Sequence, residues 1–395
     1  MVSPEDLGVY LGLDAPYTAV AGRWPAPSAR EWYSSLPWLV GTNFYPSTAI
    51  NQIEMWQGST WDSETIAREL KWGRELGFNT HRVYLHDLVW QADPEGFYQR
   101  MDQFLDLCAA AGCRPFFVFF DDCHFPTCEL GPQPQPVPGY HNSGWVSAPD
   151  RASALRMACG AASEELRQRL RGYLQGTLER FRDDTRVLFW ELYNEPGRGA
   201  GTVTAFERRH PADLEYGNLA CRFVQQTWEW AREVAPSQPV ASNTAGCVGE
   251  VNWAINFMNS DVQSIHVYDP ADETERILQQ FLQFDRPVLM TEYMARPCGS
   301  TFQAILPLLK QHKVAAINWG LVSGKSGTIW PWESRAVDGK FAPARVLREQ
   351  GRVAQRIEEL PEPEVWFHDI LRADGTPYDP DEVALIRELT ADAVW

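Results

Sequence analysis

Apolar and polar positions along this chain follow one repeating plan, in which short, mainly apolar runs alternate with longer stretches of helical periodicity. Eight such runs lie at 37–44, 80–85, 114–120, 187–193, 239–243, 262–268, 287–293 and 314–320. Runs of this kind are typical of parallel strands that are buried on both faces. The clearest helix is predicted at 97–108, where one apolar stripe ends before a glycine; its members are Phe97, Met101, Phe104, Leu105 and Cys108.

Eight strands that alternate with helices, without an internal sequence repeat, predict an α/β fold, a single (β/α)8 TIM barrel. We expect residues 36–360 to form the catalytic barrel, with a helix at 342–360 closing its ring. Residues 1–35 would be a lead-in or a cap beneath the barrel, and residues 361–395 a short C-terminal tail packed on its outside. A chain of 395 residues, 44% of them hydrophobic, is large enough for such a core.

Two of the apolar runs end in a glutamate. One leads into Asn194-Glu195-Pro196-Gly197, where Pro-Gly ends the strand in a turn, and the other ends at Glu292. A carboxylate at the end of a buried strand is costly unless it has partners and a task. Because reactive groups of such barrels lie at the carboxyl ends of the strands, we expect both carboxylates to face one cleft. Two carboxylates are the minimum equipment for cleaving a glycosidic bond.

The residues around these glutamates resemble a known family. The run from Trp190 to Pro196 resembles the acid/base strand of clan A glycoside hydrolases, and Thr291-Glu292-Tyr293 resembles their nucleophile strand. The resemblance spans about residues 38–332 and is closest to family 5 and related cellulase-like or xylanase-like enzymes. It implies a retaining β-glycosidase of oligo- or polysaccharides, in which Glu195 is the general acid/base, Glu292 is the nucleophile, and no cofactor is needed.

The same resemblance implies a supporting set at other strand ends. Arg82 and Tyr268 would hold the nucleophile in its ionised form, and Asn194 would bind the sugar 2-hydroxyl. His266 would tune the acid/base or contact the substrate, and Trp319 would form the aromatic floor of the subsite nearest the cleavage point.

Glu191 is a rival carboxylate on the acid/base strand. It lies four residues before Glu195, or about 13 Å deeper at ~3.3 Å per residue. We expect it to hydrogen-bond inside the barrel rather than to react.

The segment after the third strand, Asp121-Asp122-Cys123-His124, departs from the family pattern. Family 5 enzymes usually carry a histidine just beyond this strand, and His124 is the candidate for it. Asp, Cys and His can also bind a divalent ion, so a metal site is an alternative here. The sequence offers no second ligand cluster with suitable spacing, and we predict no metal.

A long, proline-rich loop follows at 121–150 and includes Trp145. A loop of this length inside a compact domain is usually functional or disordered, and its place after a strand puts it on the catalytic face. It could close one end of the cleft and favour cleavage at chain ends. Among the 17 tryptophans, those in strand-to-helix loops are candidates for stacking on sugars, with core packing as the alternative; they are Trp56, Trp90, Trp145, Trp330 and Trp332.

Charge and composition narrow the partners. A net charge of −17 argues against nucleic acid and anionic membranes, whereas a neutral carbohydrate is indifferent to it. No run approaches the ~20 apolar residues that span a bilayer, and the first residues lack the pattern of a signal peptide. Eight cysteines without a disulfide-type spacing indicate reduced thiols. We therefore expect a cytoplasmic enzyme.

Three other functions remain open from the sequence: a transglycosylase that uses the same two glutamates, a non-catalytic carbohydrate-binding barrel, and a metal-dependent barrel hydrolase. The sugar, the linkage and the oligomeric state are left open by these residues. A retaining mechanism makes a geometric prediction, since it requires carboxyl groups ~5–5.5 Å apart instead of the ~6.5–9.5 Å of inverting enzymes.

Overall fold

In the computed structural model, the described residues are 2–198, 211–337, 340–341 and 361–395. Its main sheet is parallel, with the strand order β5-β4-β3-β2-β1-β9-β8-β7-β6. The strands are β1 Val40–Asn43, β2 Thr80–Tyr84, β3 Arg114–Asp121, β4 Trp190–Asn194, β5 Val240–Ala241, β6 Asn243–Ala245, β7 Gln263–His266, β8 Val288–Glu292 and β9 Ala315–Trp319. Strands β5 and β6 are two pieces of one predicted strand, so the nine strands occupy eight positions in the ring. The predicted (β/α)8 barrel is confirmed.

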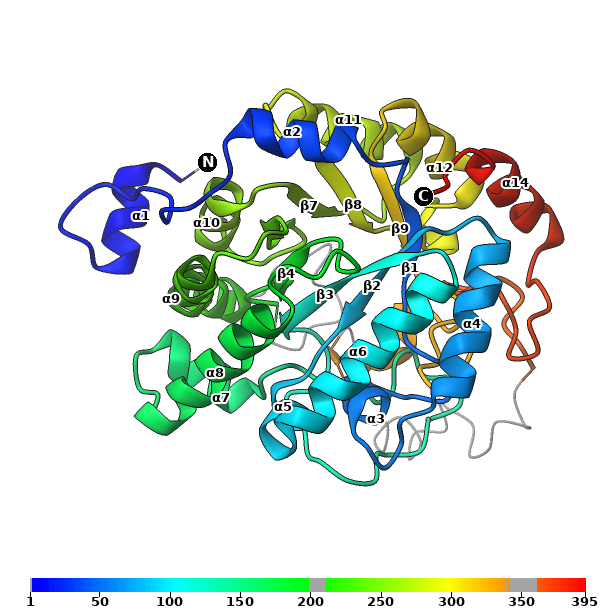
Figure 1. Cartoon of the computed structure of the whole chain (residues 1–395), viewed down its shortest axis with the longest axis horizontal. Coiled ribbons are helices and arrows are strands. Elements are labelled where there is room, and N and C mark those ends of the chain that lie inside the picture. The colour runs from blue at the N-terminus through cyan, green and yellow to red at the C-terminus, as the bar shows by residue number, and fades with distance from the viewer. Residues whose placement is uncertain (1, 199–210, 338–339, 342–360) are drawn as a thin grey trace.

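Helices surround these strands (Figure 1). They are α1 Pro4–Leu11, α2 Ala26–Ser34, α3 Gln52–Trp56, α4 Ser63–Glu75, α5 Asp87–Ala92, α6 Pro94–Ala110, α7 Arg151–Ala158, α8 Glu164–Arg180, α9 Pro211–Val234, α10 Glu250–Asn259, α11 Ala271–Leu282, α12 Phe302–Gln311 and α14 Pro380–Thr390. The stripe predicted on α6 is its buried face. Local signals set the helix starts: Asp62 caps α4 and Asp93 caps α6, each through its side-chain oxygen. The predicted helix at 342–360 lies outside the described residues.

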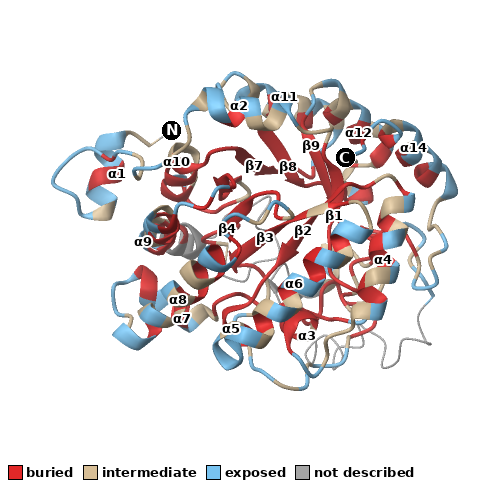
Figure 2. Ribbon diagram, in the orientation of Figure 1, coloured by how far each residue is buried: buried red, intermediate tan, exposed pale blue. Residues whose placement is uncertain are grey.

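Burial follows from this arrangement (Figure 2), with buried strands inside and helices exposed on their outer faces. At the amino-terminal end of the barrel, a separate apolar layer fills the interior; it comprises Leu39, Phe116, Leu188, Phe189, Ala241, Val262, Leu289, Ala315 and Ile317. Trp32, Tyr33 and Leu36, on α2 or just after it, pack beneath this layer. The segment before the first strand therefore covers the end of the barrel remote from Glu195.

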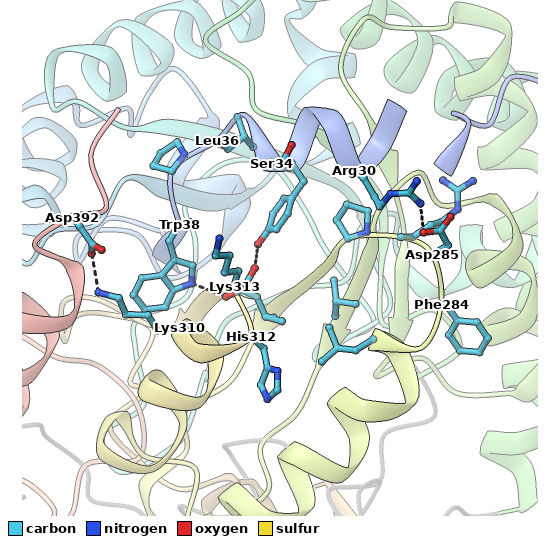
Figure 3. A pocket seen from close by; sticks show the side chains of 17 residues that line it. Arg30, Ser34, Leu36, Trp38, Phe284, Asp285, Lys310, His312, Lys313 and Asp392 are labelled. Carbon is cyan, nitrogen blue, oxygen red and sulfur yellow. Dashed lines mark hydrogen bonds and ion pairs between the residues drawn. The ribbon is translucent and has the colours of Figure 1, made fainter. Parts of the chain in front are cut away.

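A pocket of about 670 Å³ lies at that same end, beside the starts of β8 and β9 (Figure 3). Its polar groups are largely engaged with the chain. The Trp38 indole donates to the Val314 carbonyl over 2.8 Å, and the Tyr33 hydroxyl donates to the Lys313 carbonyl over 2.8 Å. Lys310 pairs with Asp392 at 2.8 Å. These contacts fasten both ends of the chain to the base of the barrel.

The C-terminal tail does not pack only on the outside of the barrel. Its helix α14 lies beside α12, as predicted for a tail on the outer surface (Figure 1). The segment before it, however, reaches the carboxyl ends of the strands, where Phe367 joins an apolar cluster with Tyr268 and Ala295. Arg296 holds this segment by donating to the carbonyls of three tail residues, Trp366, His368 and Asp369. The tail therefore forms part of the rim at the carboxyl ends of the strands.

Two further expectations concern the whole chain. No helix in the described ranges is long and apolar enough to cross a membrane. The eight cysteines all fall at described positions, and no disulfide joins them.

Candidate active site

The two glutamates predicted to react meet at the carboxyl ends of strands from opposite parts of the ring. Glu195 follows β4, and Glu292 ends β8 next to His266 of β7 in the strand register. One ligand-type atom from each of these three side chains lies within 4.8 Å of the others. All three side chains are buried. The barrel therefore brings both predicted carboxylates and the predicted histidine into one site.

Glu292 is held by donors on both of its oxygens. Arg82 approaches Oε1 through Nη1 at 2.7 Å, and the Tyr84 hydroxyl donates to the same oxygen over 3.0 Å. The Tyr268 hydroxyl donates to Oε2 over 2.8 Å, and His266 Nδ1 lies 3.4 Å from that oxygen. A carboxylate that accepts hydrogen bonds on both oxygens is held in one orientation. Arg82 and Tyr268 thus lie where the sequence placed them, and Tyr84 joins them.

Arg82 connects the two catalytic strands from inside the barrel. Its Nε pairs with Glu191 Oε2 at 2.7 Å, and its Nη2 donates to Asn194 Oδ1 over 2.8 Å. Glu191 in turn accepts from Ser264 Oγ over 2.6 Å. The deep glutamate is therefore an internal partner of Arg82, as expected from its depth. A fully buried guanidinium needs such compensation, because an unpaired buried charge is costly.

Glu195 has a different environment. Its Oε1 lies 2.9 Å from His266 Nδ1, its Oε2 accepts from the Cys123 thiol over 3.0 Å, and Arg198 forms an ion pair with it. Burial alone would raise the pKa of Glu195, but the Arg198 charge and the His266 hydrogen bond outweigh burial and lower the pKa to about 2. Burial, followed by the nearby Glu195 charge, keeps the pKa of the Cys123 thiol well above its usual range, so Cys123 remains a donor.

Asn194 is fixed from both ends of its amide. Its Oδ1 accepts from Arg82, and its Nδ2 donates to Asp121 Oδ1 over 2.9 Å. Asp121 also accepts from Trp145 Nε1 over 2.9 Å, which ties the long loop to the site. Burial raises the pKa of Asp121 to about 7, against the opposing effect of its hydrogen bonds. The contact of Asn194 with a sugar 2-hydroxyl stays a prediction.

Aromatic side chains border the nucleophile. The ring of Trp319 lies 5.8 Å from Trp145, 5.9 Å from Tyr84 and 6.1 Å from Tyr45. Trp319, at the end of β9, is across the ring from Glu195. Trp319 and Trp145, both predicted for the site, therefore belong to one cluster next to Glu292.

His124 and three of the loop tryptophans take other positions. From the segment after β3, Cys123 is the residue that reaches Glu195, whereas His124 lies against Asn142, with Nε2 3.1 Å from its Nδ2. Trp56 is core, since it is fully buried and donates to the Tyr84 carbonyl over 2.7 Å. Trp90 packs on Tyr173, and Trp330 offers its carbonyl to His141.

Trp332 lies nearer the site than these, because its ring is 5.1 Å from that of Tyr268 and 4.6 Å from that of Phe367. The tail and the loop after β9 therefore meet at the tyrosine that holds the nucleophile.

The metal alternative for 121–124 finds no support in these contacts. Asp121 accepts from Asn194 and Trp145, while Asp122 accepts from the Tyr193 hydroxyl over 3.0 Å and from the Gly197 amide over 2.7 Å. Within the part of the chain that the structure describes, the ligand-type group compact enough to share an ion is Glu195, His266 and Glu292. Its carboxylates already pair with Arg198 and Arg82, and these positive charges would oppose a cation.

Three residues of this site, Tyr84, Cys123 and Arg198, were not predicted from the sequence to touch the glutamates. Tyr84 could have been predicted from the sequence, because it lies two residues after Arg82 and therefore points to the same face of β2. Cys123 and Arg198 could not, because both lie in turns beyond their strands, where no periodicity fixes the direction of a side chain.

Comparisons with solved structures point to one fold. Exo-beta-1,4-mannosidase Op5Man5 from Opitutaceae bacterium strain TAV5 superposes with a TM-score of 0.55 at 16% identity, covering 90% of this chain and 59% of the mannosidase. The endo-beta-1,4-mannanase from Thermotoga petrophila gives 0.53 at 14% identity, with 90% and 76% covered. A glycoside hydrolase family 5 mannosidase from Rhizomucor miehei gives 0.51 at 14% identity, with 91% and 93% covered.

This chain thus spans less than two thirds of the length of Op5Man5. No protein-family model matches the sequence, and no curated protein matches it. The chain therefore shares the (β/α)8 barrel fold of these mannosidases and mannanases.

Proposed function

We propose that this protein is a retaining β-glycoside hydrolase of the family 5 type. The observation that carries the proposal is the pair of buried carboxylates at the ends of β4 and β8. One oxygen of Glu195 and one oxygen of Glu292 lie within 4.8 Å of each other, and both lie within that distance of a ring nitrogen of His266. So close an approach of two carboxylate oxygens supports a retaining site, whose carboxyl groups lie ~5–5.5 Å apart, over an inverting site at ~6.5–9.5 Å. The barrel shared with mannosidases and mannanases supports the same assignment.

In the first step, Glu292 attacks the anomeric carbon. Its hydrogen bonds with Arg82, Tyr84 and Tyr268 fix the orientation of the carboxylate. Glu195 donates a proton to the leaving oxygen, so the carbon–oxygen bond breaks and a glycosyl ester of Glu292 forms. A proton on Glu195 requires Arg198 to withdraw, because this ion pair keeps the carboxyl ionised. A sugar that enters on the leaving-group side would separate the two.

In the second step, Glu195 acts as a base. It removes a proton from water, the resulting hydroxide attacks the anomeric carbon, and Glu292 leaves as a carboxylate. The contacts of Glu195 with Arg198 and His266 suit this ionised form. These contacts of Glu195 therefore match the form that the second step requires.

β-Mannosides are the first substrates to test, because mannosidases and mannanases are among the structural neighbours. Transglycosylation is the second candidate, since a sugar hydroxyl can replace water in the second step with the same residues. A non-catalytic barrel is disfavoured, because both carboxylates are present and positioned.

A panel of 4-nitrophenyl β-glycosides of mannose, glucose, galactose, xylose and N-acetylglucosamine, together with mannan and other plant polysaccharides, tests the proposal. We expect one sugar to be hydrolysed with retention of configuration, as followed by NMR of the first product anomer. Glu292→Gln sets the background rate. Inversion, or equal rates for wild type and Glu292→Gln, would refute the mechanism; added acceptor sugars reveal transfer products.

A further inference from the structure

The contacts around Trp319 concern the part of the substrate that lies on the nucleophile side. In a retaining site, the sugar attacked by Glu292 is the glycone, and the rest of the chain departs on the Glu195 side. Tyr84 donates to Glu292, and its ring is 5.2 Å from that of Trp145. Tyr84 therefore contacts both the nucleophile and Trp145.

Three segments meet beyond Trp145, and we call them together the glycone-side wall: residues 46–52 after β1, residues 131–146 of the long loop, and residues 324–334 after β9. Asn51 donates to the Gly144 carbonyl over 2.9 Å, and Gln52 donates to the Val146 carbonyl over 2.9 Å. A Cβ added at Gly144 would lie 2.5 Å from the Ile50 side chain. The first two segments thus touch without room for even a methyl group.

The third segment, residues 324–334, contacts both of the other two. His141 Nδ1 lies 2.6 Å from the Trp330 carbonyl, and the His141 amide donates to Ser334 Oγ over 2.8 Å. The Lys325 amide donates to the Ser47 carbonyl over 2.9 Å, and Lys325 Nζ pairs with Glu54 at 2.7 Å. The glycone-side wall is therefore linked from the loop of β3 to those of β1 and β9.

This wall lies opposite the leaving-group side. Trp319 and Tyr45, which pack on Trp145, belong to β9 and to the loop after β1, whereas Glu195 follows β4. The strand order places β3, β2 and β1 between β4 and β9. A sugar bound over Glu292 therefore has aromatic side chains and interlocked loops at its non-reducing end.

We propose that this enzyme acts at chain ends, and that the glycone-side wall admits one terminal sugar residue and excludes a longer chain on that side. The inference rests on the proposed function and defines its substrate, a β-linked oligosaccharide with a free non-reducing end. The proposal concerns the glycone side alone and leaves the length of the aglycone open. Each turnover releases one monosaccharide from the non-reducing end.

Two matched oligosaccharides of the sugar found with the nitrophenyl panel test this proposal. Both carry a fluorescent label at the reducing end, and one also carries an ethylidene group across the 4- and 6-hydroxyls of its terminal sugar. We expect the uncapped substrate to shorten by one residue at a time and the capped one to stay intact. Early products of many sizes, or equal cleavage of the capped substrate, would overturn chain-end action while hydrolysis itself stands. A folded protein that cleaves nothing would overturn the proposed function as well.

A variant of the wall adds a second measurement. His141→Ala removes the contact with the Trp330 carbonyl, and we expect the ratio of capped to uncapped cleavage to rise about fivefold, as for the loss of one hydrogen bond. His312→Ala is the control, because His312 pairs with Glu275 at the far end of α12 and should leave the ratio unchanged. A ratio that does not move in a folded His141→Ala protein would count against the wall. If that variant fails to fold, the two wild-type substrates alone decide.

Discussion

Glu195 and Glu292 are chemically alike, and their neighbours make them different. Glu292 accepts hydrogen bonds from Arg82 of β2 and from Tyr268, which follows β7. Glu195 pairs with Arg198, three residues further along a turn, which can exchange its partner. These two environments agree with the proposed double displacement, in which the acid/base, and not the nucleophile, changes protonation between steps.

The division of roles can be separated by what each step needs. A nitrophenol leaves without a proton, so Glu195→Ala should form the glycosyl-enzyme quickly and then stall. Azide needs no deprotonation, and it should restore turnover and give a β-glycosyl azide. Glu292→Ala should show no burst and lose activity by about 10⁴-fold or more, since no covalent intermediate can form. Stopped-flow release of nitrophenolate and NMR of the azide product are the measurements; identical behaviour of the two variants would contradict the assignment.

Arg198 should control the pH range of the first step. Arg198→Met removes the charge that lowers the pKa of Glu195, so this pKa rises and Glu195 stays protonated to higher pH. For a substrate with a poor leaving group, the alkaline limb of kcat/KM should move up by about 1–3 pH units, the usual effect of an opposite charge.

Two controls accompany Arg198→Met. Arg198→Lys keeps the charge and should keep the limb near that of the wild type. A nitrophenyl glycoside needs no proton and should show no shift in the same variant. An alkaline limb that stays in place in a folded Arg198→Met protein would remove Arg198 from control of the acid.

The sequence predicted this site well where regular strands fix directions. Arg82, His266 and Glu292 lie at positions where an alternating strand points its side chains inward, and the family resemblance assigned their partners. Cys123 and Arg198 escaped prediction because they follow the last regular residue of β3 and β4. There, single backbone dihedrals decide the direction of a side chain, and the sequence carries no periodic signal for them.

Among the elements, the turn that ends β4 determines where the acid/base points. Glu195 has a φ of 42°, a strained conformation for a residue with a side chain, and Gly197 follows with a φ of 83°. The turn is clamped from two sides: the Gly197 amide donates to Asp122, and the Val248 amide donates to the Pro196 carbonyl over 2.9 Å. Strain of this kind persists only where neighbouring elements hold it, as they do here.

Gly197→Ala should therefore lower activity as well as stability. A Cβ at this position would lie 2.5 Å from the Val248 carbonyl oxygen and 2.7 Å from the Gly217 Cα, so the turn must shift in addition to the cost of a positive φ. That strain alone is about 1–2 kcal/mol. Urea unfolding and the rate on a nitrophenyl glycoside are the measurements.

Gly160→Ala is the matched control for this change. Gly160 has a φ of 69° and nothing within 4 Å of an added Cβ, so it carries the strain without the clash. We expect it to lose stability by about 1–2 kcal/mol and to retain kcat. Equal effects of the two variants on kcat would mean that the turn does not position Glu195.

Sequence patterns also differ in how well they predict whole elements. The eight strands were found because each is a compact apolar run, but the fifth is broken into β5 and β6 by a single residue, which no hydrophobic pattern shows. The loop at 121–150 was predicted to lie on the catalytic face, and it does. The loop also contacts the segments that follow β1 and β9. These contacts join residues far apart in the sequence, such as Asn51 and Gly144, so a local hydrophobic pattern cannot predict them.

At the scale of the molecule, both ends of the chain complete the barrel. The segment before β1 plugs the amino-terminal end with Trp32, Tyr33 and Leu36, while the tail crosses to the opposite rim. His368 lies there with its ring 5.7 Å from Tyr268, and its Nδ1 lies 2.6 Å from the Met294 carbonyl. A tail that reaches both the outer helices and the catalytic rim links the stability of the fold to the geometry of the site.

Arg296 is the residue through which this link should be tested. It is buried, pairs with buried Glu382 of α14 at 2.7 Å, and donates to carbonyls of the tail. Arg296→Met leaves the Glu382 charge buried without its partner, which costs about 3–5 kcal/mol.

We expect a large fall in the urea midpoint of this variant. At urea concentrations where the barrel stays folded, we also expect faster proteolysis of the tail and a reduced kcat/KM, because Phe367 and His368 no longer support Tyr268. Arg276→Met, which removes only an exposed pair with Glu273 on α11, should leave the midpoint and the activity unchanged. If Arg296→Met released the tail without any loss of kcat/KM, the tail would stabilise the barrel without shaping the site.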